Sequence, residues 1–398
     1  AATASPTAAA TATRRASPTP APTQLIVWEG LPPAQSEALA EDIESFTTAH
    51  PQVMIDLQHY NAPAEFIAAV QGGRAEFDLV LGPQALVAGL QAGGYLVPLE
   101  EIVAPDFLEG FIQPARSGAQ MNDRQWGLPA TAGFHLLLFY NTDLVEEPPA
   151  TTSELFDLAE ARTGEGQWGL AINSYDPLWL LPWLGAYGGW LTDGADTPNL
   201  DSQAMEQALT LWLKWQGRIA GIAPVITYTE ARDLFLDGHV AMLVDGEWAI
   251  GDFRQADRVP WAVAPLPDVG STGQAATPLI LARYWAVGGE AGGDAPASTS
   301  QQQAIAAFLE FVTEPQRQLR WTSQFGLLPT RSEALNSPQI LNDPILRVSA
   351  RQLQAGRGLP LNLNPDTLLQ AMRAPLREML DGRLTPQEAA AAMQSAVE

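Results

Sequence analysis

The sequence has no cysteine among its 398 residues. This absence excludes disulfide bonds, thiolate nucleophiles, zinc–thiolate centres and iron–sulfur clusters. It does not identify a compartment, because exported proteins of this size often fold without disulfides.

Basic residues are also scarce. Lys214 is the only lysine, and the formal net charge is -24. A surface of this charge repels polyanions, which argues against nucleic acid or an acidic membrane face as a partner. Apolar runs are short as well, and none approaches the roughly 18 uninterrupted residues that a membrane-spanning helix needs.

Signatures of catalysis are missing too. The chain has no Gly-x-x-x-x-Gly-Lys, Gly-x-Ser-x-Gly or His-Glu-x-x-His, and no Gly-x-Gly-x-x-Gly follows an expected strand. The four histidines are scattered rather than placed at metal-ligand spacing. We therefore expect no enzyme, no cofactor and no metal. The 45 acidic residues leave a glycosidase-type carboxylate pair open.

Residues 1–24 are nearly all Ala, Thr, Ser and Pro, and Arg14 and Arg15 are their only charges. Such a segment has nothing to bury and is expected to form a disordered, proline-stiffened tether. Tethers of this kind are common in lipid-anchored exported proteins. We expect an extracytoplasmic protein anchored through a residue upstream of this sequence, with a plain disordered terminus as the alternative.

The rest of the chain has the pattern of an α/β protein. An apolar run at 25–28, alternating apolar residues at 53–57 and the segment 77–81 predict strands, and the periodic segments between them predict helices. Strand–helix alternation of this kind is typical of a mostly parallel sheet. Because the length exceeds what one hydrophobic core usually supports, about two domains are expected.

The most informative stretch is 235–248, Phe-Leu-Asp-Gly-His-Val-Ala-Met-Leu-Val-Asp-Gly-Glu-Trp. Gly238 favours the end of a helix, and the apolar run 240–244 predicts a strand. The strand stops at Asp245-Gly246, so Trp248 is placed at its carboxyl end. Open α/β sheets bind their ligands at this edge.

This stretch resembles the hallmark of the extracellular solute-binding proteins that serve ABC sugar importers, the maltose-binding-like group. Asp-Leu-Val-Leu, Gly-Tyr-Leu-Val-Pro-Leu, Trp-Gly-Leu-Pro, Leu-Phe-Tyr-Asn-Thr-Asp-Leu and Leu-Pro-Thr-Arg also occur in that group's order. The resemblance implies a two-lobed periplasmic-binding-protein-like fold of type II, with a mostly parallel, helix-flanked sheet in each lobe and a ligand cleft between them. It implies an N-terminal lobe of 25–131 plus 283–329 and a C-terminal lobe of 132–280 plus 332–398.

The candidate site is built from aromatic and polar residues, because a sugar needs flat apolar platforms beside hydrogen-bonding groups. By the resemblance, Trp248 stacks on the ligand and Asp176 hydrogen-bonds to it. Gly82, Ala85 and Leu86 lie where the maltose binder carries a Trp and a charged pair, and Leu178 replaces an aromatic, so maltose itself is in doubt. The expected ligand-binding set is Trp248, Asp176, Glu29, Gln84, Tyr175, Trp179, Phe134, Glu247, Arg283, Tyr284 and Asn364.

The expected function is the binding component of an ABC importer, a monomer that closes about a hinge on a carbohydrate and presents it to a membrane permease. Two alternatives stay open. The same fold could bind a polyamine, an amino-acid derivative or an anion, and Arg283 would suit an acidic sugar or another carboxylate. A secreted glycoside hydrolase is the other.

Overall fold

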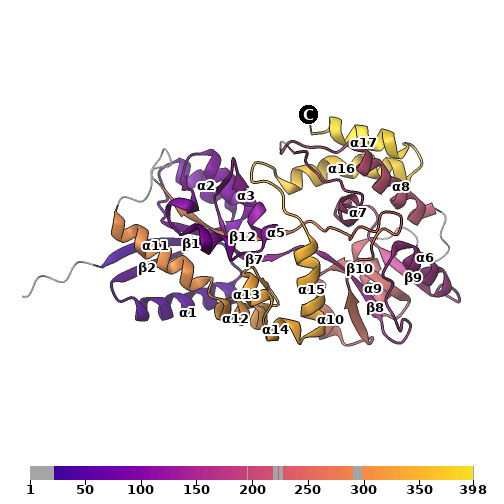
Figure 1. The fold of residues 1–398 in the computed structure, drawn as a ribbon, viewed down its shortest axis with the longest axis horizontal. Coiled ribbons are helices and arrows are strands. Elements are labelled where there is room, and N and C mark those ends of the chain that lie inside the picture. The colour runs from indigo at the N-terminus through magenta and orange to yellow at the C-terminus, as the bar shows by residue number, and fades with distance from the viewer. Residues whose placement is uncertain (1–21, 195, 218–222, 224–226, 290–297, 398) are drawn as a thin grey trace, which may run out of the picture.

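The computed structural model describes residues 22–194, 196–217, 223, 227–289 and 298–397. Most of the expected tether lies outside these ranges, and so does the middle of 288–300, a segment rich in Gly, Ala and Ser. The chain forms two lobes side by side, each built on its own β-sheet (Figure 1). Among the described residues, no helix is both long and apolar enough to cross a membrane.

The sheet of the first lobe has the strand order β13-β7-β12-β3-β1-β2, and β4 also pairs with β12. Its strands are β1 (Thr23–Glu29), β2 (Val53–His59), β3 (Leu79–Pro83), β4 (Leu96–Val97), β7 (Leu128–Gly133), β12 (Leu281–Gly288) and β13 (Leu328–Pro329). A separate two-stranded sheet pairs β5 (Gln120–Met121) with β6 (Arg124–Gln125).

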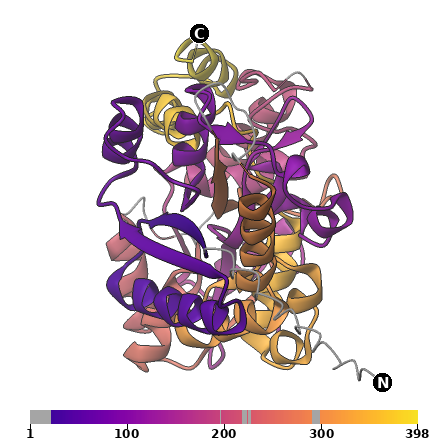
Figure 2. The same ribbon diagram turned by 90° about the vertical axis from the view of Figure 1, so that its left-hand side faces the viewer.

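Helices cover both faces of the first sheet, as the end-on view shows (Figure 2). Leu79 and Leu81 belong to the core cluster that contains residues of α1 and α11, whereas Val80 belongs to the cluster with α2, α3 and α5. A strand buried on both faces must be apolar throughout, which is why 79–81 is a continuous hydrophobic run. The helices of this lobe are α1 (Pro33–Ala49), α2 (Pro63–Gln71), α3 (Gln84–Ala92), α4 (Pro105–Glu109), α5 (Gln113–Ser117), α11 (Thr299–Val312) and α12 (Pro315–Phe325), with a 3-10 turn η1 (Leu99–Glu101).

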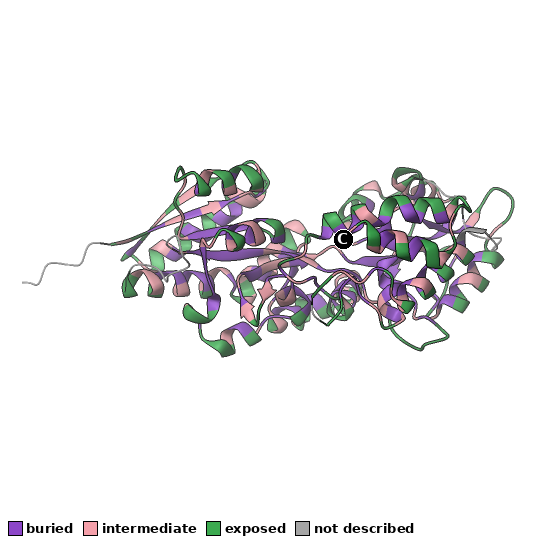
Figure 3. Cartoon of the chain, turned by 90° about the horizontal axis from the view of Figure 1, so that it is seen from above, coloured by how far each residue is buried: buried purple, intermediate pink, exposed green. Residues whose placement is uncertain are grey.

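The second lobe is built on the sheet β11-β8-β10-β9. Its strands are β8 (Leu136–Asn141), β9 (Trp168–Ile172), β10 (Val240–Gly246) and β11 (Trp261–Ala264). Its helices are α6 (Thr152–Ala161), α7 (Leu181–Ala186), α8 (Gln203–Gly217), α9 (Tyr228–Leu236), α10 (Ala249–Ala256), α16 (Pro365–Leu380) and α17 (Pro386–Ser395), with a 3-10 turn η2 (Pro177–Trp179). Buried strands thus lie inside each lobe and half-exposed helices outside (Figure 3).

The segment 177–186 forms η2 followed by α7; η2 begins at Pro177, and α7 has Pro182 as its second residue. One expectation about the sheets is wrong. Both sheets were expected to be mostly parallel, but they are mixed. Strand β1 is parallel to β2 and β3, whereas β12 is antiparallel to β3, β4 and β7.

The mixed direction follows from how the chain passes between the lobes. Strand β8 enters the second lobe from β7, so it begins where β10 ends: Leu136 faces Gly246 and Leu137 faces Asp245. Likewise β12 returns from the second lobe and begins beside Pro83, at the end of β3. A strand that starts at the carboxyl end of its neighbour must run antiparallel to it, whereas a helical crossover would have brought it back parallel.

Helix α15 (Pro344–Ala355) joins the lobes. It follows α13 (Ser332–Leu335) and α14 (Pro338–Leu341), and it stands between the two lobes in Figure 1. Ala350 and Leu353 belong to a core cluster of the first lobe, whereas Ile345 and Val348 pack against a cluster of the second. One helix therefore contributes to both hydrophobic cores.

Candidate functional site

A cleft of about 1050 Å³ lies between the lobes. The first lobe contributes Pro83, Thr131, Arg283 and the segment 322–328, and the second contributes Phe134, Glu247, Trp248 and part of α10. The α14–α15 region lines it as well. A concave site of this size between two bodies is the usual place for a small-molecule ligand.

Trp248 is carried to the cleft by the strand that precedes it. Strand β10 is buried along its whole length and ends at Gly246, after which the chain turns into α10. A side chain at position 246 would place its Cβ 2.2 Å from the Trp248 ring. The glycine of the Gly-x-Trp motif is therefore required for the ring to fold back over the strand end, where it stays 37% exposed.

Four aromatic side chains, Phe134, Trp179, Tyr228 and Trp248, form what we call the aromatic platform. The Trp248 ring lies 5.3 Å from that of Phe134 and 6.3 Å from that of Trp179, and Trp179 lies 5.7 Å from Tyr228. The Nε1 of Trp248 donates a hydrogen bond of 2.8 Å to the Tyr228 hydroxyl. Trp179 is buried and donates to the carbonyl of Val244, so it supports the platform from below.

Glu247 fixes the backbone at the first passage between the lobes. Phe134 has a φ of 71°, a left-handed conformation that is uncommon outside glycine. Its N–H donates a 2.6 Å hydrogen bond to Oε1 of Glu247. A Cβ on Gly133 would come within 2.3 Å of the same oxygen, so a side chain there would push the Glu247 carboxylate away from the Phe134 N–H.

Behind Glu247 lies His135, which is fully buried. Its Nε2 is 2.7 Å from the hydroxyl of Ser349 on α15, and its Nδ1 is 3.9 Å from Oε2 of Glu247. Burial lowers the pKa of His135 to about 3 and raises the pKa of Glu247 to about 7. The histidine is therefore neutral at any physiological pH.

Asp245 and Arg232 lie beneath the platform. Burial raises the pKa of Asp245 to about 7, although its Oδ1 accepts the N–H of Gly246 at 2.7 Å and Arg232 Nε is 3.6 Å from its Oδ2. The Arg232 guanidinium lies over the rings of Tyr228 and Phe253, at 5.4 and 5.2 Å from their centroids. Arg232 therefore holds Tyr228 in place beneath Trp248.

Of the residues expected from the sequence, Phe134, Glu247, Trp248 and Arg283 line the cleft. Glu29 is instead buried in the first lobe, where it accepts from Leu31 N at 2.5 Å and Ser36 Oγ at 2.8 Å and lies 3.0 Å from His59 Nδ1. The buried hydroxyl of Tyr284 donates to the Ala115 carbonyl.

Gln84 lies away from the cleft lining and joins distant parts of the chain. Its buried amide nitrogen is within 3.0 to 3.3 Å of the carbonyl oxygens of Leu359, Pro360 and Leu363. These residues lie on the segment that leads from α15 to α16. Gln84 therefore ties the first lobe to the last passage of the chain into the second.

The remaining expected residues lie on the second lobe, outside the cleft lining. Asp176 caps η2 through the N–H of Leu178 and forms a 3.1 Å ion pair with Arg373. Tyr175 lies under the Arg377 guanidinium, 5.0 Å away. Asn364 is exposed and caps α16.

Sequence reasoning missed Tyr228, because the single tyrosine at the start of a helix carries no spacing signal. Nor does the sequence tell which tryptophans are core. Trp183, Trp212 and Trp215 pack together in the second lobe and are almost completely buried, with the rings of Trp183 and Trp215 4.5 Å apart. Across the described ranges, no group of three or more His, Asp or Glu residues is arranged to hold a metal ion.

The molecule has two lobes, each with its own sheet, a cleft between the lobes and a helix that links them. This is the architecture of a solute-binding protein. The chain belongs to the bacterial extracellular solute-binding protein family, whose model matches residues 42–348. The resemblance found in the sequence is thereby confirmed.

Individual relatives agree with this family. The maltotriose-binding protein of Pyrococcus abyssi is 26% identical over 341 residues, which cover 81% of this chain and 70% of that protein. A maltooligosaccharide ABC transporter solute-binding lipoprotein of Streptococcus pneumoniae is 23% identical over 304 residues, covering 71% of this chain and 66% of that protein.

The fold is similar to that of solved structures. The maltose/maltodextrin-binding domain MalE from Bdellovibrio bacteriovorus, bound to maltotriose, superposes with a TM-score of 0.70 at 25% identity, over 94% of this chain and 98% of that one. The expected two-lobed fold is confirmed.

Proposed function

We propose that this chain is the extracytoplasmic substrate-binding component of an ABC importer and that it binds a carbohydrate between its lobes. The observation that carries the proposal is the aromatic platform, which presents the partly exposed Trp248 to a cleft of about 1050 Å³. A flat ring beside polar groups matches the apolar face and hydroxyl rim of a sugar. Family membership and the sugar-binding relatives support the same ligand class.

The lobes are proposed to comprise 25–131 with 283–329 and 132–280 with 332–398. The sheet to which each strand belongs supports this division, and α15 contributes to both lobes. Phe134, Glu247, Trp248 and Arg283 are proposed to contact ligand in the cleft. Tyr175, Asp176 and Asn364 would contact it from the second lobe after closure. Glu29, Gln84, Trp179 and Tyr284 would act as supports, because their polar atoms already bond within the protein.

The mechanism is hinge closure. Ligand contacts from both lobes stabilise the closed form, which a membrane permease then recognises. The protein would act as a monomer held at the membrane by a lipid anchor, and it would break no bond. A binder of a non-sugar ligand and a secreted glycoside hydrolase are the two alternatives.

The first test is thermal melting of the full chain against mono-, di- and oligosaccharides, amino acids, polyamines and organic anions. A ligand at 100 times its dissociation constant adds about 2.7 kcal/mol to the free energy of unfolding. We expect one sugar class to raise the melting temperature, and Trp248→Ala to abolish the shift. Met54→Ala, which removes another exposed apolar side chain on β2, should leave it unchanged.

Each other outcome has a clear meaning. A shift with an amino acid, polyamine or non-sugar anion alone would overturn the sugar assignment and keep the fold. Turnover of a glycoside that is abolished by a single Asp or Glu substitution would make the protein a hydrolase.

A further inference from the structure

Four charged side chains line the cleft: Glu247, Arg254, Arg283 and Asp343. Arg254 pairs with Asp343 at 3.3 Å, and Glu247 accepts the N–H of Phe134. Arg283 is different, because no ion pair or hydrogen bond joins its side chain to any residue that the structure describes. One guanidinium is thus left free in the cleft of a protein whose net charge is -24.

The position of Arg283 is fixed by strand β12. It pairs with Pro83 on β3 and Thr131 on β7, and all three residues line the cleft. Its neighbours Ala282 and Tyr284 belong to the core cluster with α2, α3 and α5. Since side chains alternate along a strand, Arg283 is on the opposite face, which packs against α1 and α11, and near the start of β12 it also lines the cleft.

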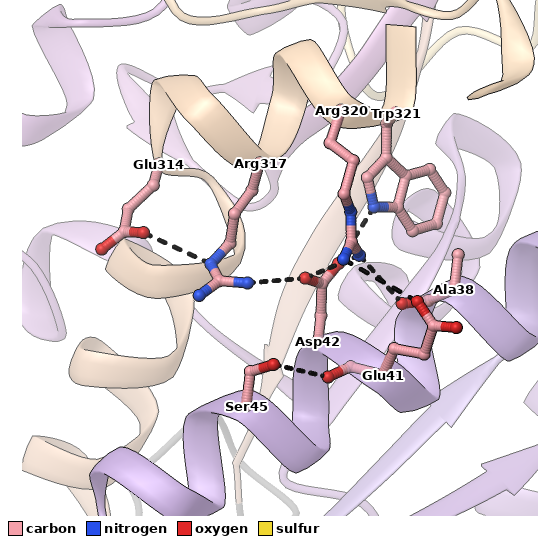
Figure 4. A network of polar contacts seen from close by, with 8 residues as sticks. All are labelled: Ala38, Glu41, Asp42, Ser45, Glu314, Arg317, Arg320 and Trp321. Carbon is pink, nitrogen blue, oxygen red and sulfur yellow. Dashed lines mark hydrogen bonds and ion pairs between the residues drawn. The ribbon is translucent and has the colours of Figure 1, made fainter. Parts of the chain in front are cut away.

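An acidic residue that shares a cavity with Arg283 is already paired. Asp42 and Arg283 line one small cavity of about 30 Å³. However, Asp42 Oδ1 lies 2.7 Å from Arg317 and 2.8 Å from Arg320, and its Oδ2 accepts from Trp321 at 3.0 Å (Figure 4). With both oxygens engaged, Asp42 does not neutralise Arg283.

Closure of the cleft would make a free guanidinium costly. Removing a charge from water without a partner is strongly unfavourable, whereas a carboxylate or phosphate can accept two parallel hydrogen bonds from arginine. The first lobe offers few other charged groups to the neutral hydroxyls of a sugar. Positions 85 and 86, for example, hold Ala85 and the fully buried Leu86.

We infer that Arg283 binds an anionic group of the ligand, so that the cleft prefers a sugar bearing a carboxylate or a phosphate over its neutral counterpart. This inference rests on the proposed sugar-binding function. It identifies Arg283 as a residue that determines specificity within that class.

Calorimetric titration of matched ligands tests it. The pairs are maltotriose with maltotrionate, its aldonic acid, and glucose with glucuronate and with glucose 6-phosphate; they separate the carboxylate from the phosphate source. A hydrogen bond to a charged group contributes roughly 1.5–3 kcal/mol, so the acidic member of a pair should bind on the order of tenfold or more tightly. This preference should shrink as salt is added.

Three variants isolate the side chain. Arg283→Gln should lower the affinity for the acidic sugar far more than the affinity for the neutral one, so that the preference is lost, and Arg283→Lys should retain part of it. Arg258→Gln alters an arginine that is paired with Asp237 outside the cleft lining, and it should leave the preference in place. Circular dichroism of each variant checks its fold.

Equal affinities for neutral and acidic sugars in the wild-type protein would overturn the inference and leave the sugar-binding function standing. The inference would also be overturned if Arg283→Gln lowered the affinities for neutral and acidic sugars equally. In that case neither Arg283→Lys nor added salt would change the ratio of the two affinities. If no sugar of either kind binds, the proposed function itself fails.

Discussion

Glu247 is a titratable residue that also holds the backbone in place, through its hydrogen bond with the N–H of Phe134. Its side chain retains 18% of its accessible surface, and burial raises its pKa from 4.5 to about 7. The folded state therefore holds a proton between about pH 4.5 and 7 that the unfolded state has released. By linkage, the free energy of unfolding falls as pH rises through this window.

We expect Glu247→Gln to be more stable than the wild-type protein above pH 7, by up to about 3 kcal/mol. The amide oxygen can still accept the N–H of Phe134, while the titrating group is gone. The advantage should vanish near pH 5, where Glu247 is protonated. Urea denaturation at pH 5, 6, 7 and 8 measures it.

The lowered pKa of His135 acts in the opposite direction, since it makes stability rise with pH between about 3 and 6.5. This contribution is present in both proteins and cancels in the difference between them. Glu37→Gln, at an exposed glutamate of α1, should show no such pH dependence. A stability difference for Glu247→Gln that is the same at pH 5 and pH 8 would show that ionisation of Glu247 is not involved.

Sequence reasoning at the residue scale works where the determinants are local. Trp248 was placed in the site because a strand, a glycine and an aromatic follow one another within a few residues. Gln84 was expected in the site because it follows a strand, but its hydrogen-bond partners lie at least 275 residues further along the chain. No local pattern indicates such a contact.

At the scale of elements, α1 and α12 are held together by one buried carboxylate. Asp42 on α1 is 2% exposed and binds Arg317, Arg320 and Trp321, all on α12 (Figure 4). The two helices are more than 260 residues apart in sequence. The pairing fastens a late segment of the chain to the beginning of the first lobe.

Asp42→Ala should therefore be destabilising, because Asp42 is the buried anion that Arg317 and Arg320 share, and each would keep only a more exposed acidic partner. Breaking a fully buried ion pair from one side typically costs about 3–5 kcal/mol, and the partial exposure of both guanidinium groups places the expected loss at about 2–3 kcal/mol. Urea denaturation monitored by circular dichroism measures the loss.

The neighbouring Glu41 provides a matched control. It lies on the same helix, is 61% exposed and is 3.8 Å from Arg320. A surface ion pair contributes little, so Glu41→Gln should change stability by about 0.5 kcal/mol or less. Similar losses for both substitutions would mean that Asp42 is not the anchor between these helices.

Elements themselves could mostly be predicted from their periodicity, whereas strand direction could not. The segments that became β1, β8, β9 and β10 are apolar enough to be recognised as strands. Whether β12 runs parallel or antiparallel to β3 depends on the lobe from which the chain arrives. That information is absent from the strand's own residues.

At the scale of the whole molecule, the interleaving of the lobes was accessible only through resemblance to a family. The chain passes between the sheets after Gly133, between β11 and β12, and along the region of α15. Both lobes are built from strands and helices of the same periodicity, so the pattern along the chain does not mark these passages. The cleft, too, exists only once both lobes are assembled.

The passages also predict how the molecule responds to ligand. Glu247 holds the backbone at Phe134, and Gln84 holds it at 359–363. We expect these contacts to keep the lobes connected while they rotate to close the cleft between them. We expect a sugar that raises the melting temperature to lower the radius of gyration in small-angle X-ray scattering, because binding across both lobes favours the closed form. Trp248→Ala at the same sugar concentration should keep the unliganded value. Tight binding with an unchanged radius of gyration would show that the ligand occupies one lobe alone, and hinge closure would then not be the basis of recognition.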